Sequence, residues 1–160
     1  MGLALLIAAC GPELSPEERA QRDAEAVEQV EASQKPSAIA IAPAAIRQPD
    51  IEKHDMFGLG CSFAAEGGGM GAIAITLIDK AFMKVDGEVL LFAPDVGSPE
   101  TRYGTREKFD GKQFSFRLEL LQKDGEQVGA ETMEHDARLV ARDGRDRIIY
   151  QSPGYAQCGA

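Results

Sequence analysis

The alternation of apolar and polar residues predicts a β domain in the C-terminal two thirds of the chain. Phe114 to Leu120 places an apolar side chain at every second position, with polar or charged residues between them. Residues 137–141 repeat this alternation. A period of two is typical of a strand with one buried face, so both segments are predicted to be half-buried strands.

Three further runs look apolar on both faces. They cover residues 72–78, 81–85 and 88–93. Strands that are covered on both sides have this composition. We therefore expect 72–78 to be the first long strand and the other two runs to form a central hairpin.

Four Asp-Gly dipeptides separate the strand-like runs. Asp-Gly tolerates positive φ at both central positions of a type I′ turn, so it is a strong hairpin signal between such runs. The four dipeptides are Asp86-Gly87, Asp110-Gly111, Asp124-Gly125 and Asp143-Gly144. About seven short strands in roughly 110 residues are typical of a small barrel or sandwich. The sequence therefore predicts a mainly β fold, an antiparallel meander barrel or sandwich, over residues 51–160.

A single helix is predicted ahead of this domain. Ser15 is a suitable N-cap, Pro16 fits the first turn, and Glu18 completes a capping box, so the helix is expected from about Pro16 to Ser33. Its few apolar residues form a narrow stripe. They are Ala20, Ala24, Val27 and Val30. This pattern favours a solvated spacer, with a weak coiled-coil partner as the alternative.

Residues 34–50 are rich in alanine and contain Pro36, Pro43 and Pro49. This composition is typical of a semi-extended linker. We therefore interpret residues 10–50 as a tether that holds the β domain at a distance from whatever anchors the chain.

The N-terminus carries the candidate anchor. Leu3 to Ala9 is an apolar stretch with the length of an export-signal core, and it ends in small residues. Ile7-Ala8-Ala9-Cys10 resembles the lipobox of bacterial lipoproteins. The resemblance implies that residues 1–9 are a signal segment, that cleavage occurs before Cys10, and that Cys10 is lipidated. The alternative is an apolar strand that packs into the core.

Two details extend this resemblance. No Lys or Arg precedes the apolar run, so we expect the true start codon further upstream. Gly11, rather than Asp, follows the cysteine. In lipoproteins this implies sorting to the outer membrane, where the domain would face the periplasm.

The cysteine count is consistent with this location. Lipidation of Cys10 would leave Cys61 and Cys158 as a pair in an oxidising compartment. We predict a disulfide between them that joins the first and last strands of a closed sheet. Two free buried thiols are the alternative.

Charge excludes one class of partner and suggests another. A net charge of −9 argues against nucleic-acid binding. Residues 102–117 are nevertheless locally basic. Their basic side chains are Arg102, Arg106, Lys108, Lys112 and Arg117.

A two-residue turn at Asp110-Gly111 would pair Lys108 with Gln113, Arg106 with Ser115 and Arg102 with Glu119. It would place Arg102, Arg106, Lys108 and Arg117 on one solvent-facing side of the hairpin. We predict a basic ridge that contacts an anionic partner such as a lipid head group, lipopolysaccharide or an acidic protein cleft. The alternative is an ordinary solvated face.

Catalytic and cofactor chemistry is not indicated. The glycine run at 67–71 is followed by a strand-like segment instead of the helix that a dinucleotide site needs. His54 and His135 are expected in surface loops, and two histidines fall short of a metal site. No nucleophile elbow is present. We therefore predict no cofactor, no metal and no enzymatic activity, with a hydrolase that uses an unrecognised site as an alternative.

Two resemblances bear on function. The Cys-to-Cys span, Val85-Asp86-Gly87-Glu88 and Ser98-Pro99-Glu100-Thr101-Arg102-Tyr103 resemble the membrane-bound inhibitor of c-type lysozyme family. That family is a small lipid-anchored β-barrel with a terminal disulfide, and it enters the lysozyme cleft with a Ser-containing loop and a nearby basic side chain. The resemblance implies such roles for Ser98, Tyr103 and Lys112.

More broadly, the chain resembles uncharacterised proteobacterial lipoproteins with a Cys-bracketed β domain. We expect a lipid-anchored, non-enzymatic envelope protein whose β domain binds a partner. The candidates are an envelope protein, an anionic glycolipid or lysozyme, and lysozyme inhibition is an alternative function.

Overall fold

The computed structural model describes residues 15–34, 37–69 and 71–159. The predicted signal segment and Cys10 lie outside these residues. The described part consists of a helical unit and a β unit that begins at Ala38. None of its helices is long and apolar enough to cross a membrane.

The predicted helix is present as α1 (Pro16–Gln34). Its capping box forms as expected. The Ser15 N–H donates to Glu18 Oε2 at 2.8 Å, and the Glu18 N–H donates to Ser15 Oγ at 3.2 Å. The bond from the Ser15 backbone lowers the pKa of Glu18. Val27 and Val30 of its apolar stripe are exposed.

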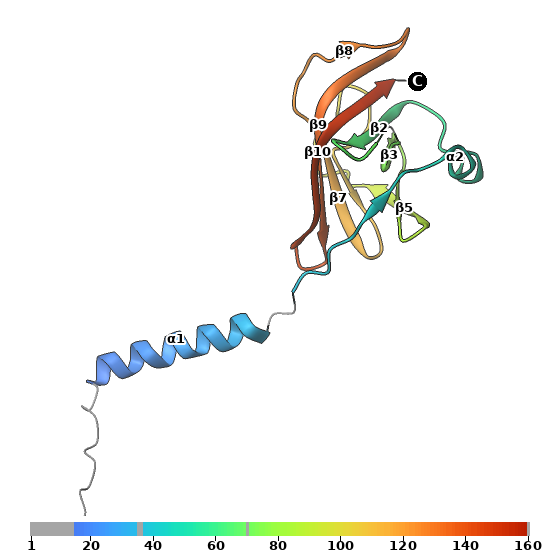
Figure 1. The fold of residues 1–160 in the computed structure, drawn as a ribbon. Coiled ribbons are helices and arrows are strands. Elements are labelled where there is room, and N and C mark those ends of the chain that lie inside the picture. Colours follow the sequence, from blue (N-terminus) through green and yellow to red (C-terminus); the bar gives the residue numbers. More distant parts are fainter. Residues whose placement is uncertain (1–14, 35–36, 70, 160) are drawn as a thin grey trace, which may run out of the picture. The chain divides into compact units, whose positions relative to one another are not determined.

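The β unit is a closed antiparallel barrel of eight strands (Figure 1). Each strand pairs with the next along the chain, and the last pairs with the first. The strands are β2 (Gly60–Ala65), β3 (Ala74–Leu77), β4 (Ala81–Val85), β5 (Glu88–Pro94), β6 (Lys108–Asp110), β7 (Phe114–Leu120), β9 (Thr132–Asp143) and β10 (Ile148–Gly159). A short strand, β8 (Glu126–Gln127), pairs with β9 outside this circuit. The meander prediction is confirmed, and the architecture is a barrel.

The barrel closes where β10 meets β2. Cys158 lies directly opposite Cys61 in this pairing, and the two sulfurs form a disulfide. The predicted disulfide at the seam is therefore confirmed. β2 itself was not predicted, because its residues are small or apolar on both faces and do not alternate with polar ones.

Aromatic side chains fill the barrel interior. Phe116 lies at the centre of this core, with its ring centroid 4.9 Å from that of Phe92 and 5.5 Å from that of Phe109. All three rings are buried, together with Phe63, Met83 and Leu139. The alternation in β7 is confirmed, since its apolar positions point into this core.

The Asp-Gly dipeptides lie at or beside connections, and one forms the predicted turn. Asp86 and Gly87 have φ of 51° and 80°, and they connect Val85 directly to Glu88. A longer loop follows Asp143, whose carboxylate accepts from Arg147 Nε and from the Arg145 and Arg147 backbone N–H groups. These bonds, the Arg147 side chain foremost, lower the pKa of Asp143 to about 2.

The predicted linker is wrong for residues 38–50. Residues 38–56, which we call the strap, pack against the barrel: Ala38 and Ile41 contact its main core, and Ile46 and Met56 contact its outer face. β1 (Pro43–Ala44) pairs with β4, and α2 (Gln48–His54) follows. Proline suits a short edge strand such as β1, because an edge leaves N–H groups unpaired in any case.

A second small core fixes the strap. Ile46 and Met56 are buried against barrel residues that face outward. The latter are Ile75, Leu77 and Phe82. The Asp50 carboxylate also bonds Lys84 Nζ at 2.7 Å, and this contact lowers the pKa of Asp50. The strap therefore explains why β3 and β4 are apolar on both faces.

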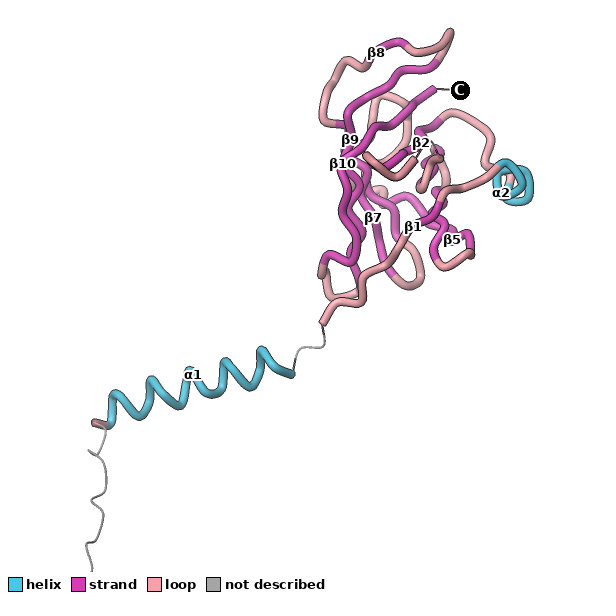
Figure 2. The backbone as a smooth tube through the Cα atoms, viewed as in Figure 1, coloured by secondary structure: helices cyan, strands magenta, loops and turns pink. Residues whose placement is uncertain are grey.

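The two ends of the barrel differ. One end, which we call the loop end, carries residues 56–59, 78–80, 95–107 and 121–131. The other, the turn end, carries the connections at 66–73, 86–87, 111–113 and 144–147. The strap begins at the turn end, where the Ile41 N–H donates to the Ile149 carbonyl oxygen at 3.0 Å (Figure 2).

Candidate partner-binding site

The β5–β6 loop, residues 95–107, contains four of the predicted partner-binding residues. Its base is held by Asp95, which accepts from Lys108 Nζ and from the Gly97 N–H, both at 2.9 Å. The Lys108 ammonium, with a smaller effect of the Gly97 N–H, keeps the pKa of Asp95 below its usual value. Bonds to Asp95 and Asp110 raise the pKa of Lys108 in turn.

Ser98 supports this loop from within. Its hydroxyl donates to the Asp95 carbonyl oxygen at 2.8 Å and accepts from the Lys108 N–H at 3.2 Å. The residue is 7% exposed. Lys112 lies in the turn beyond the other end of β6, so the structure does not group it with Ser98 and Tyr103. A lysozyme-inhibitor role for these three residues stays a prediction.

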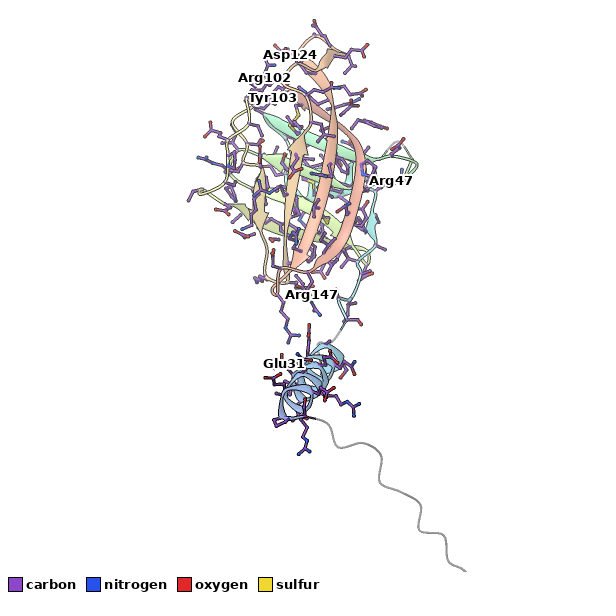
Figure 3. The ribbon with its side chains drawn as sticks, turned by 90° about the vertical axis from the view of Figure 1, so that its left-hand side faces the viewer. Glu31, Arg47, Arg102, Tyr103, Asp124 and Arg147 are labelled. Atoms are coloured by element: carbon purple, nitrogen blue, oxygen red, sulfur yellow. A yellow bond between two sulfur atoms is a disulfide. The ribbon has the colours of Figure 1, made fainter. Side chains whose placement is uncertain are left out.

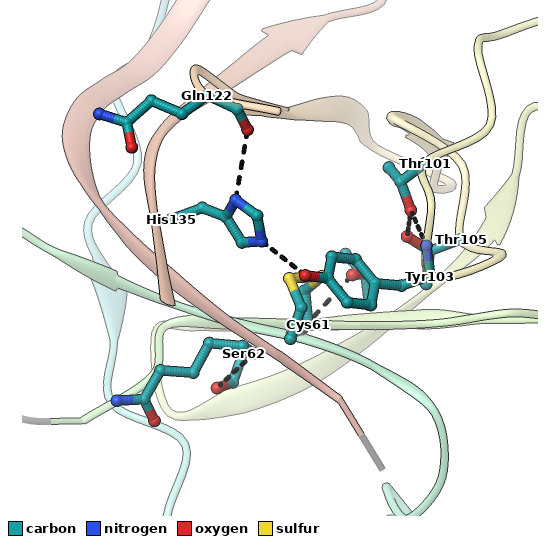
Figure 4. The surroundings of a disulfide bond; sticks show 10 residues. Cys61, Ser62, Thr101, Tyr103, Thr105, Gln122 and His135 are labelled. Carbon is teal, nitrogen blue, oxygen red and sulfur yellow. Dashed lines mark hydrogen bonds between the residues drawn. A yellow bond between two sulfur atoms is a disulfide. The ribbon is translucent and has the colours of Figure 1, made fainter. Parts of the chain in front are cut away.

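Tyr103 connects the two long loops of the loop end through His135. The Tyr103 hydroxyl lies 2.6 Å from His135 Nε2, and His135 Nδ1 lies 3.3 Å from the Gln122 carbonyl oxygen (Figure 4). A carbonyl only accepts, so Nδ1 carries the hydrogen and Nε2 accepts from the tyrosine. His135 is 1% exposed, so its prediction as a surface loop residue is wrong. The period of β9 places it on the inward face.

We expect Tyr103→Phe to lower the free energy of unfolding by about 1–3 kcal/mol, because buried Nε2 would lose its donor. Chemical denaturation measures this loss. Tyr155→Phe is the matched control, since the Tyr155 hydroxyl has no hydrogen-bond partner among the residues described. Equal losses in the two variants would mean that the His135 contact adds nothing specific.

A cleft of about 580 Å³ lies between the two long loops. Leu120 and Leu121 contribute its apolar surface. Arg102 spans it by donating to the Lys123 carbonyl oxygen at 3.0 Å, and it lies 3.6 Å from the Asp124 carboxylate. Arg102, Tyr103 and Asp124 lie together at this end (Figure 3). Leu120, Leu121, Lys123 and Asp124 were not predicted as site residues.

The predicted register of the β6–β7 hairpin is wrong. Lys108 pairs with Arg117 and Asp110 with Ser115, because the turn lies at Lys112 and Gln113. The Gly111 N–H donates to the Phe114 carbonyl oxygen at 3.0 Å and closes this turn. A Cβ on Gly111 would lie 2.6 Å from the Phe92 ring, so glycine serves close packing here.

The predicted basic ridge is wrong in two respects. Arg102 and Arg106 belong to the β5–β6 loop, so only Lys108 and Arg117 lie side by side on strands. Four of the five cations also pair with carboxylates. These pairs are Arg102–Asp124, Arg106–Glu100, Lys108–Asp95, Lys108–Asp110 and Arg117–Glu107. The prediction considered only the charges within residues 102–117. Three of the paired carboxylates lie outside this segment: Asp95, Glu100 and Asp124.

Lys108 and Arg117 instead border a groove of about 340 Å³ on the barrel wall, which we call the outer groove. β9 pairs with β7 and adds Arg138 and Arg142 to it. The remaining lining residues are Ser115, Phe116, Glu119, Val140, Asp146 and Gln151. Sequence reasoning missed the two β9 arginines, although they alternate with buried Leu139 and Ala141.

Comparison with known proteins identifies no relative. Neither a protein-family model, nor a curated protein, nor a solved structure matches the chain. Within the described ranges, no group of three or more His, Cys, Asp or Glu residues is placed to hold a metal ion. The candidate binding surfaces are therefore the loop-end cleft and the outer groove.

Proposed function

We propose that this chain is a non-enzymatic, lipid-anchored envelope protein that binds a partner protein through the loop end of its barrel. One observation carries the proposal. Most of the large apolar side chains that the β unit leaves exposed lie at the loop end, with 40% to 81% of each residue accessible. They are Phe57, Leu59, Ile78, Val96, Leu121 and Val128.

Several of these exposed apolar side chains are neighbours or border the cleft. Gly60 pairs with Leu77, so Leu59 and Ile78 are the next neighbours across the same two strands. Leu121 borders the 580 Å³ cleft. Apolar surface gathered beside polar rims is typical of protein interaction sites.

The loop end is also held in shape before any partner arrives. The Tyr103–His135 bond fixes the β5–β6 loop against Gln122, and Asp95 fixes the base of that loop. Loops that are already ordered lose less conformational entropy on binding. This favours a binding role for the cleft.

The tether from Cys10 would join the barrel at its turn end. The strap begins at the turn end, where Ile41 bonds to Ile149. Residues 10–37 precede the strap in the chain. A lipid on Cys10 would thus connect to the barrel at the turn end, whereas most of the exposed apolar residues lie at the loop end. We propose an outer-membrane anchor with the barrel in the periplasm.

Site-specific photo-crosslinking in intact cells tests the binding role. A photoreactive residue at Leu121 or Ile78 is expected to capture one discrete protein, whereas the same residue at Leu91 or Ile148 is not. Leu91 and Ile148 are matched controls, because their exposed fractions of 63% and 46% bracket the 57% and 52% of Leu121 and Ile78, and they lie in β5 and β10. Equal capture at both sets of positions, or no capture at the loop end, would refute the proposal.

Mass spectrometry of the native protein tests the anchor separately. We expect a mature N-terminus at Cys10 that carries lipid. An unmodified Met1 in the native protein would refute the anchor and leave the crosslinking result unaffected.

A further inference from the structure

We propose that the outer groove binds a phosphate group between Arg117 and Arg142, with Ser115 as a third donor. This site goes beyond the proposed function, because it lies on the barrel wall and not at the loop end. The shared chemistry is that of a phosphate monoester or inorganic phosphate. Such a group is available from a lipid head group or from solution.

The strand register brings the three side chains together. Ser115 lies directly opposite Arg142, and Arg117 lies opposite Val140. Arg117 and Arg142 are therefore diagonal neighbours on one face, a relation that places Cβ atoms about 7–8 Å apart. All three residues line the same groove.

Both arginines have guanidinium N–H donors that are not used by their present contacts. Arg117 donates through Nη1 to Glu107 Oε2 at 2.8 Å. Arg142 donates through Nη1 to the Asp146 carbonyl oxygen at 2.7 Å, while the Asp146 carboxylate lies 3.8 Å away and is 88% exposed. A guanidinium has five N–H donors, so one contact each leaves most of them available.

Ser115 adds a hydroxyl between these groups. In the part of the chain that the structure describes, this hydroxyl has no hydrogen-bond partner. Two guanidinium groups and one hydroxyl can donate to several oxygens of one tetrahedral anion. Arginine matches phosphate geometry with paired bonds, which favours this anion over a single carboxylate.

Each cation of the groove has a carboxylate partner, and the partners differ in how firmly they are held. Four basic residues line the groove, and Asp95, Asp110 and Glu107 pair with Lys108 and Arg117 from its border, so the site depends on free N–H donors and not on an excess of positive charge. Of the two carboxylates that line the groove, Glu119 is occupied by Arg138, whose Nη2 and Nε lie 2.6 and 3.1 Å from Glu119 Oε2. The Asp146 side chain is 88% exposed, and its carboxylate lies 3.8 Å from Arg142 Nη1.

Titration of the full chain tests the site. One arm uses inorganic phosphate, followed through the Arg Nε–H resonances in NMR. The other uses sedimentation with phosphatidylcholine vesicles, with and without phosphatidic acid. We expect saturable, salt-sensitive binding in at least one arm, and Arg117→Gln with Arg142→Gln should weaken it by at least about tenfold, because each lost contact is charge-assisted.

Controls separate this site from general charge effects. Arg102→Gln removes one positive charge at the loop end, as each single substitution does in the groove, and should leave phosphate binding unchanged. Ser115→Asp keeps both arginines but places a carboxylate between them, so it should abolish binding even if the double variant folds poorly.

Binding to phosphate alone would identify a soluble ligand, and binding to vesicles alone would identify a lipid phosphate. Either result supports the site. No binding in both arms, or binding that survives the double variant and Ser115→Asp, would overturn it. Crosslinking at the loop end would be unaffected in every case, so the two proposals fail separately.

Discussion

Replacement of Cys61 and Cys158 together by alanine is expected to lower the free energy of unfolding by about 4–5 kcal/mol. The two cysteines are 97 residues apart in sequence, so the disulfide closes a loop that contains nearly the whole barrel. An unfolded chain without this link gains the conformational entropy that the loop had removed. The bond also joins the two strands that close the barrel, where only the β10–β2 pairing would remain.

Chemical denaturation of the wild type, the double variant and the reduced wild type measures this loss. The reduced protein and the double variant should unfold at similar denaturant concentrations, well below the oxidised protein. Cys10→Ser is the matched control, because it removes a cysteine that is not part of the bridge. An unchanged midpoint on reduction would mean that strand pairing alone holds the seam.

The barrel was predictable because its main signals are local. Alternation in β7 reports one buried face, and Asp86-Gly87 supplies the two positive φ angles that a two-residue hairpin requires. The Cys61–Cys158 pairing followed from a count of three cysteines and one lipidation signal. None of these inferences needed to know which strand lies beside which.

The strap was missed because its anchors are sparse. Ile41 and Ile46 are isolated large apolar residues within a stretch rich in alanine and proline. The composition of that stretch predicts a linker. Ile41 packs against the main core of the barrel, and Ile46 is buried against the outward-facing apolar residues of β3 and β4; all of these partners come later in the chain. The sequence predicts that both faces of those strands are apolar, but it does not identify the segment that covers the outer face.

The site was only partly predictable for a similar reason. The β6–β7 turn brings Gly111 against Phe92 of β5, a contact that a reading of the local sequence does not indicate. The outer groove depends on β9 lying beside β7, which brings Arg142 opposite Ser115. A basic segment read along the chain therefore found Lys108 and Arg117 but not their neighbours across the sheet.

Phe116→Ala is expected to lower the free energy of unfolding by about 3–5 kcal/mol. Phe116 is buried at the centre of the core, and its ring contacts those of Phe92 and Phe109. Its loss removes apolar burial and leaves a cavity that the surrounding strands cannot collapse, because the barrel is closed. Phe116→Leu retains most of the volume and should cost much less.

Arg117→Gln, one residue along β7, is the informative comparison. Arg117 points outward, and its ion pair with Glu107 is of the partly exposed kind that contributes about 1 kcal/mol or less. If the inward residues of β7 stabilise the fold and its outward residues bind phosphate, Phe116→Ala should lower the midpoint of unfolding. Under conditions where this variant is folded, it should still bind phosphate. Arg117→Gln should do the reverse. A Phe116→Ala protein that is folded but no longer binds phosphate would show that the outer groove depends on the core beneath it, and that its arginines do not act as an independent surface.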